Sequence, residues 1–272
     1  MKHAMSPETL RSLPRRIGQM FHRQSIRAIT ATEYHISRVA VLWCVLLGLV
    51  IVARLIVIAG KAHATGAWFA SAAVYALILL SPVIGLLMAT RAFPRGMLHA
   101  LPEIPLARIG TWQRVDPLTA QDHPSFGVSG LMAGFIIGLL MNIAIRTSEF
   151  LAAVPVMASM GPDWSRTLFF ALAADCIFFN IMYAAAFIMA LRHAPWFPRV
   201  MLLIWITDIL SQLTIARLLG AQVLPGSVGS ALASLLVGNV NKSLISICLW
   251  LPYLILSEKV NITYRRRVRL QE

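Results

Sequence analysis

Four ionisable side chains lie inside long runs of apolar residues: Arg54, Asp175, Asp208 and Lys242. A charge that is buried in a bilayer is costly, so such a residue is a candidate for function by default. With a helical rise of about 1.5 Å per residue, Asp208 and Lys242 fall at matching depths, near the midplane of two consecutive apolar stretches. Arg54 lies near the end of its stretch, from which its side chain can reach the polar interface. The sequence therefore predicts an intramembrane pair formed by Asp208 and Lys242.

Other polar residues share the helix faces of this pair. They are Ser211 and Gln212 beside Asp208, and Asn239, Ser243 and Ser246 beside Lys242. The pair can act as a clamp that fixes the register of two helices, or as a proton relay, ion relay or ligand site. The clamp is favoured, because one pair with no third titratable group makes a poor pathway. Asp175 and Asn180 are further polar candidates on the preceding stretch.

Signatures of catalysis are nearly absent from the chain. It has no His-Glu-x-x-His, no phosphate-binding glycine loop and no Gly-x-Ser-x-Gly. Gly127-Val-Ser-Gly130 matches the short serine motif of rhomboid intramembrane proteases, but all seven histidines lie outside the apolar stretches and no base is at hand. The three cysteines have no Cys-x-x-Cys spacing. We expect no catalytic residues, no metal site and no cofactor.

The elements that must position these residues are membrane-spanning helices. Of the 272 residues, 58% are hydrophobic and 13% are charged, and the mean hydropathy is +0.73. A soluble domain has about half apolar and a quarter charged residues, so both a soluble globule and a disordered chain are excluded. The recurring apolar stretches have the length of about 20 residues that crosses a bilayer. The predicted fold is an all-α polytopic membrane protein.

Windows of about 19 residues predict six spans, at 39–60, 67–89, 126–145, 167–191, 199–219 and 230–256. The chain then divides into a basic N-terminal segment, a transmembrane hairpin, a proline-rich loop, a four-helix transmembrane unit and a basic tail. These parts cover residues 1–38, 39–89, 90–125, 126–256 and 257–272.

The basic residues predict the orientation of the spans. The net charge is +13. Of the Lys and Arg residues in the loops, in the tails and at the ends of the spans, 18 fall on the side of the termini and four on the other side. Cytoplasmic loops of membrane proteins are enriched in Lys and Arg. Both termini are therefore expected in the cytoplasm, and the excess charge is expected to face an anionic inner leaflet and not a nucleic acid. The N-terminal segment is either a basic amphipathic helix on that leaflet, with Leu13 and Ile17 on its apolar face, or an unstructured basic tail.

A row of small residues marks the third span. Gly130, Gly134 and Gly138 recur every four residues, and Asn142 continues the row. Small residues at this spacing let helix backbones approach closely, and an asparagine can donate a hydrogen bond across the contact. The row predicts packing against another helix, another membrane protein or a second copy of the chain.

Residues 125–265 resemble the domain-of-unknown-function 2569 family of four-helix bacterial inner-membrane proteins. The resemblance rests on Gly127-Val-Ser-Gly-Leu-Met-Ala-Gly134, on Leu191-Arg-His-Ala-Pro-Trp-Phe-Pro-Arg199 followed by Asp208, and on Ile247-Cys-Leu-Trp-Leu-Pro-Tyr-Leu-Ile-Leu-Ser-Glu-Lys-Val-Asn-Ile-Thr-Tyr264. It implies a multi-pass protein of the bacterial cytoplasmic membrane and no particular activity. The first two spans and the basic N-terminus have no counterpart in that family.

Three functions are compatible with the sequence. The leading one is a non-catalytic accessory or scaffold subunit of a membrane assembly, because the glycine row offers a packing surface and no catalytic constellation is visible. The alternative is a small secondary transporter or ion-coupled carrier that uses Asp208 and Lys242. An intramembrane enzyme is the third.

Overall fold

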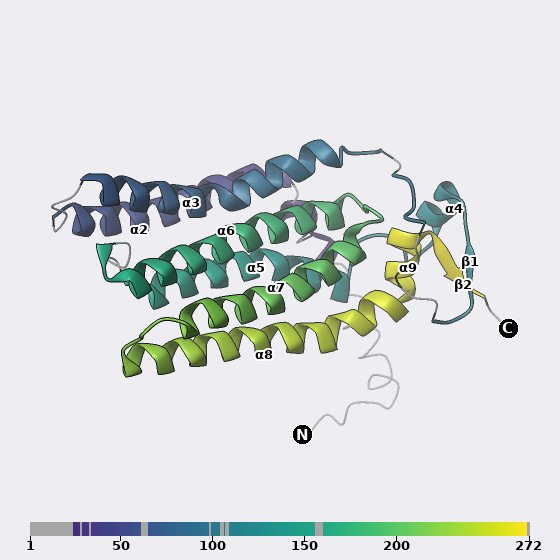
Figure 1. Cartoon of the computed structure of the whole chain (residues 1–272). Helices are drawn as coiled ribbons and strands as arrows, with labels where there is room; N and C mark the ends of the chain where they lie inside the picture. The colour runs from purple at the N-terminus through teal and green to yellow at the C-terminus, as the bar shows by residue number, and fades with distance from the viewer. Residues whose placement is uncertain are drawn as a thin grey trace, which may run out of the picture.

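The residues that the structure describes form a bundle of six long apolar helices. Figure 1 shows the computed structural model, which describes residues 24–27, 29–32, 34–60, 65–97, 99–103, 106, 109–155 and 160–270. The six helices are long and apolar enough to cross a membrane: α2 (Ile36–Ala59), α3 (Thr65–Ala92), α5 (Leu131–Ala153), α6 (Asp163–Leu191), α7 (Phe197–Gly220) and α8 (Gly226–Leu256). The predicted all-α membrane fold is confirmed. The predicted amphipathic helix near Leu13 lies outside the described residues.

The third helix differs most from its predicted bounds. It was expected over 126–145, but α5 begins at Leu131 and continues to Ala153. A charged residue lowers the mean hydropathy of the window, and Arg146 therefore ends the predicted span. In the structure Arg146 is inside α5 and only 12% of its side chain is exposed, so it does not belong to a loop.

Helix α6 is the centre of the bundle. It packs against α3, α5 and α7, while α8 packs on α7 and α2 on α3. The contact between α3 and α6 is the most extensive one. Residues at intervals of three and four lie on one face of a helix and can contact the same neighbour. On α3 the buried residues with this spacing are Ser71, Tyr75, Ile78, Pro82, Gly85 and Ala89. The two main apolar clusters each draw residues from both α3 and α6, so the N-terminal hairpin shares its core with the other four helices.

Gly85 lets α3 approach α6 this closely. A Cβ atom placed on Gly85 would lie 2.9 Å from the Cβ of Ala184 and still closer to the carbonyl oxygen of Ile181. Any larger side chain would push the two backbones apart.

Arg54 joins α2 to the far end of α5. Its guanidinium donates to the carbonyl oxygen of Val154, at 3.2 Å, and to that of Leu151. Carbonyl groups in the last turn of a helix have no partner within it, and a cation there also meets the negative end of the helix dipole. Arg54 therefore has a partner in the protein, whereas the sequence predicted only that it reaches the interface.

A small polar cap closes one end of the bundle (Figure 1). It consists of α4 (Pro117–Asp122), α9 (Glu258–Arg265), β1 (Trp112–Arg114) and β2 (Arg267–Arg269). The two strands pair antiparallel, with Arg114 opposite Arg267. Tyr264 is fully buried and its hydroxyl donates to the carbonyl of Ala190, at 3.0 Å. The loop 90–125 and the basic tail, which the sequence treats as separate segments, thus meet in one structure.

We predict that Gly85→Leu destabilises the bundle by about 1 to 3 kcal/mol, the usual cost of overpacking. The matched control is Gly48→Leu on α2, where a Cβ atom would meet nothing within 4 Å. Thermal unfolding in detergent measures both variants. Equal unfolding temperatures for the two would mean that α3 and α6 are not in close contact.

Candidate functional site

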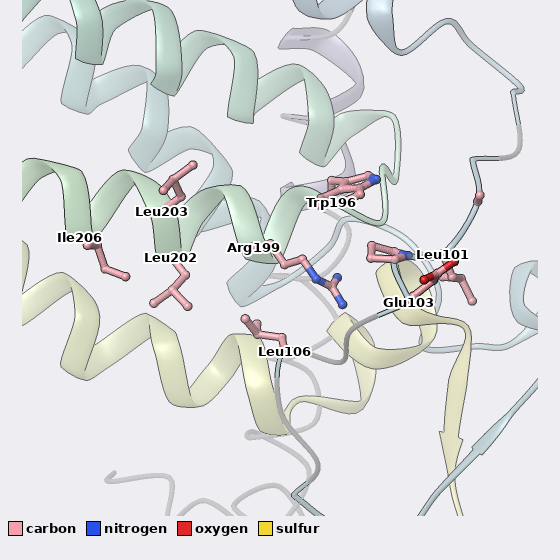
Figure 2. Close-up of a pocket in the computed structure, with 10 residues that line it drawn as sticks. Leu101, Glu103, Leu106, Trp196, Arg199, Leu202, Leu203 and Ile206 are labelled. Carbon is pink, nitrogen blue, oxygen red and sulfur yellow. The ribbon is translucent and has the colours of Figure 1, made fainter.

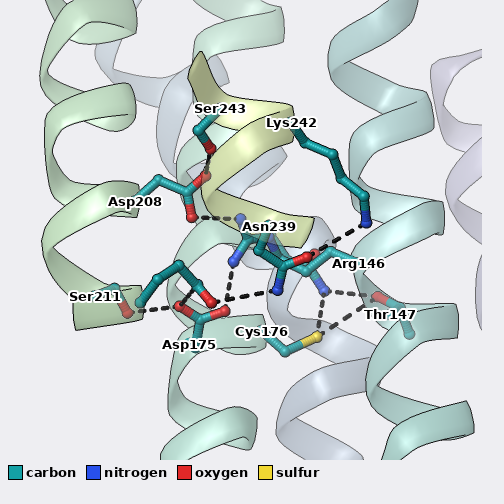
Figure 3. A network of polar contacts seen from close by, with 11 residues as sticks. Arg146, Thr147, Asp175, Cys176, Asp208, Ser211, Asn239, Lys242 and Ser243 are labelled. Carbon is teal, nitrogen blue, oxygen red and sulfur yellow. Dashed lines mark hydrogen bonds and ion pairs between the residues drawn. The ribbon is translucent and has the colours of Figure 1, made fainter. Parts of the chain in front are cut away.

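A buried charged triad lies at the centre of the bundle, formed by Arg146 of α5, Asp175 of α6 and Asp208 of α7. The guanidinium pairs with Asp175 through Nη1 and with Asp208 through Nη2, the latter at 2.5 Å. Figure 3 shows the two carboxylates around this one guanidinium. The aspartate side chains are 8% and 3% exposed. Three helices therefore meet through one cation.

Every carboxylate oxygen of the triad has a hydrogen-bond donor. Asp175 Oδ1 accepts from the Ser211 hydroxyl at 2.6 Å and from the Gln212 amide at 3.2 Å. Asp208 Oδ2 accepts from the hydroxyl of Ser243, which brings in α8. The Arg146 guanidinium also lies over the ring of Phe179, 4.3 Å from its centroid. A buried network that is satisfied in this way stiffens its surroundings and specifies one arrangement of them.

A second ion pair lies toward the surface, and we call it the outer pair. Lys242 of α8 pairs with Glu149 of α5, and its side chain is 55% exposed. Lys242 also donates to Asn239 Oδ1 at 3.3 Å, and Asn239 donates to Gln212 Oε1 at 3.3 Å. This chain of hydrogen bonds connects the outer pair to the triad.

The predicted direct pair of Asp208 and Lys242 is wrong. Both residues belong to one polar network, but Asp208 pairs with Arg146 and Lys242 pairs with Glu149. The reason is the length of α5, whose extra turns carry Arg146 and Glu149 into the bundle. There Arg146 pairs with Asp208, and Glu149 pairs with Lys242. The expectation that no third titratable group is present is wrong for the same reason.

Asn180 lies beside the triad and is not part of it. Its amide donates to Thr147 Oγ1 at 3.0 Å and contacts Cys176 Sγ at 3.6 Å. It is fully buried, and its Oδ1 has no partner among the described residues. Asn180 thus adds a further polar contact between α5 and α6, next to the one that Asp175 makes.

A small polar cavity adjoins the network between α5 and α8. Its volume is about 40 Å³, and Asn142, Arg146, Glu149, Asn239 and Lys242 are among its lining residues. A site needs roughly 10–15 Å³ to hold one water molecule, so the cavity has room for water or a small ion and not for an organic solute.

Two glycines of the predicted row, Gly134 and Gly138, do not face another described helix of this chain. Gly130 precedes α5 and has a φ of +62°, so it serves as the turn that starts the helix. Gly134 and Gly138 are exposed, and a Cβ atom on either would meet nothing within 4 Å. Asn142 lines the polar cavity. Helix α5 contacts α6 through its opposite face, so packing through the row against a second protein stays a prediction.

Among the described residues, no group of three or more His, Cys, Asp or Glu side chains is placed to hold a metal ion. The chain matches no protein-family model, no curated protein and no solved structure.

We predict that Arg146→Met destabilises the protein by about 3 to 5 kcal/mol, because it leaves two buried carboxylates without a partner. The triple variant Arg146→Met, Asp175→Leu, Asp208→Leu should recover much of that loss, because it removes the carboxylates as well. Chemical or thermal unfolding in detergent gives the comparison.

The control is Lys242→Met, which removes a cation from the outer pair. Since more than half of the Lys242 side chain is exposed, this change should have little effect on stability. A loss as large as that of Arg146→Met would contradict the central role of the triad.

Proposed function

We propose that the protein is a non-catalytic accessory or scaffold subunit of an assembly in a bacterial cytoplasmic membrane. The observation that carries this proposal is the open face of α5. The exposed residues Gly134, Gly138, Met141, Ile145 and Ser148 recur at intervals of three or four and form one stripe along the helix. Its two glycines leave room for a second backbone.

The open face suits a transmembrane helix of another protein or of a second copy of this chain. Without a hydrophobic driving force inside a bilayer, helices associate through close backbone approach and through hydrogen bonds. In the stripe, Gly134 and Gly138 permit close backbone approach, and Ser148 can form a hydrogen bond. The triad supports the same proposal, since a satisfied clamp across α5, α6 and α7 holds the open face in a fixed position.

Carrier activity is the second candidate, and one observation favours it. The triad and the outer pair together hold three carboxylates and two cations, which leaves one net negative charge beside the polar cavity. A proton or a small cation would neutralise that charge. A carrier of this kind would use Asp175, Arg146 and Asp208 in place of the direct pair that the sequence predicted. Proton or cation uptake into proteoliposomes that is lost in Asp208→Asn would favour it.

We predict that Gly138→Leu leaves the folded yield of the protein in detergent unchanged, because its Cβ has space, and abolishes recovery of a stoichiometric partner. Crosslinking in native membranes followed by affinity purification and mass spectrometry identifies the partner or a second copy. Gly48→Leu, the matched change on α2, should retain it. If Gly138→Leu and Gly48→Leu retain the same partners, the open face of α5 is not the binding surface.

We also predict that both termini lie in the cytoplasm, because Lys and Arg gather on their side of the spans. Reporter fusions after Lys2 and after Glu272 should both show cytoplasmic activity. Periplasmic activity from either fusion would overturn this orientation.

A further inference from the structure

Four arginines converge where the polar cap meets the end of α7. Arg114, Arg199, Arg265 and Arg267 line one small cavity of about 50 Å³, and we call them the arginine site. Glu103 is the one carboxylate among the described residues that line it. The four arginines come from β1, α7, α9 and β2, so tertiary structure alone brings them together.

The strand pairing places two of these charges face to face. Arg114 lies directly opposite Arg267 in the antiparallel ribbon. Like charges in opposed positions destabilise a strand pair. Neither arginine is in an ion pair with a described carboxylate. The ribbon therefore holds a repulsion that a bound anion would relieve.

Arg265 is the most buried member of the site. It is 7% exposed, and it donates to the carbonyls of Leu254 and Ile255 and to the side-chain oxygen of Asn261. These acceptors are neutral, and its Nε has no partner among the described residues. Burial, followed by the charges of Arg267 and Arg199, lowers the pKa of Arg265 to about 10. A buried charge of this kind calls for an anionic partner.

An apolar groove continues from the arginine site along α7. Its volume is about 770 Å³, and Leu202, Leu203 and Ile206 form its wall on the helix. Figure 2 shows these side chains in succession along α7, with Arg199 and Trp196 at the end next to the cap. The groove and the arginine site share Glu103, Leu106 and Arg199 in their linings. Since α7 is a membrane-spanning helix, the groove leads from the polar interface toward the bilayer interior.

We propose that the arginine site binds the phosphate of an anionic phospholipid, with one acyl chain lying in the groove along α7. Guanidinium groups form paired, charge-assisted hydrogen bonds to phosphate oxygens, and the apolar wall fits a hydrocarbon chain. The groove is what favours a lipid over free phosphate. No described residue of α5 lines the site or the groove, so the proposal does not depend on the proposed scaffold function.

Lipid binding to the purified full-length protein tests the proposal. Dioleoyl phosphatidylglycerol, dioleoyl phosphatidylcholine and inorganic phosphate are each titrated in a neutral detergent, and both the unfolding temperature and the lipid retained in native mass spectrometry are measured. Phosphatidylglycerol should bind saturably and raise the unfolding temperature, whereas phosphatidylcholine should bind at least about tenfold more weakly. Stabilisation by inorganic phosphate alone to the same extent would make it a free-anion site and overturn the lipid assignment.

The variants distinguish lipid binding at the arginine site from nonspecific attraction to surface charge. Arg267→Gln should weaken phosphatidylglycerol binding by about tenfold to a hundredfold, the loss of a charge-assisted hydrogen bond. Arg269→Gln is the matched control, because it removes the same charge from the same strand at a position outside the site. An equal loss in the control would overturn the proposal. Ile206→Ser should weaken lipid binding through the groove, and unchanged binding would contradict the placement of the acyl chain.

A last variant tests whether these arginines have a purely structural role. Arg114 is exposed, so Arg114→Gln should fold. Without lipid its unfolding temperature should equal or exceed that of the unaltered protein, because repulsion with Arg267 is removed, yet phosphatidylglycerol should stabilise it less. A lower unfolding temperature without lipid, together with undiminished stabilisation by phosphatidylglycerol, would show that Arg114 serves the fold and not a lipid.

Discussion

The arrangement of α5, α6 and α7 depends on one guanidinium that is shared by two aspartates. Apolar packing between membrane helices is weakly directional, because lipid tails solvate an apolar side chain as well as a neighbouring helix does. The contacts of Arg146 with Asp175 and Asp208 are directional, and a displacement of any of the three helices would strand a charge in a medium that does not solvate it. Ser243 extends this constraint to α8. The triad therefore sets rotation and register, while apolar contacts fill the space around it.

The helices and most of the polar residues within them can be predicted from the sequence, but the ion pairs between these residues cannot. Length and hydropathy alone determine where a chain crosses a bilayer, so the six helices were found. Asp175, Asp208 and Asn239 were recognised because polar residues stand out in apolar stretches. Arg146 was missed because the same hydropathy signal ended its helix at the first charge. Two aspartates on neighbouring spans, with Lys242 as the one cation predicted beside them, were a signal in themselves, since the second carboxylate requires a buried basic residue of its own.

Contacts between distant segments explain the other failures. The stripe of α3 that contains Gly85 is visible in the sequence as small and apolar residues at intervals of three and four, but its partner α6 is separated from it by a whole helix and a loop. The pairing of Arg114 with Arg267 joins the proline-rich loop to the tail, and neither three-residue strand has a sequence pattern of its own. The glycine row shows a related limit: its spacing is a packing signal, but spacing does not say whether the partner belongs to the same chain.

The two groups of arginines differ in how their charge is compensated, and this difference indicates different roles. Arg146 meets two carboxylates, each already supplied with further donors, so carboxylates of the protein itself compensate its charge. Arg265 and Arg267 donate to neutral oxygens beside further arginines, and no described carboxylate forms an ion pair with either of them. A fold tolerates such an excess only where something outside the chain neutralises it. Its position at the end of a membrane-spanning helix, beside an apolar groove, makes the lipid bilayer the nearest source of that neutralising group.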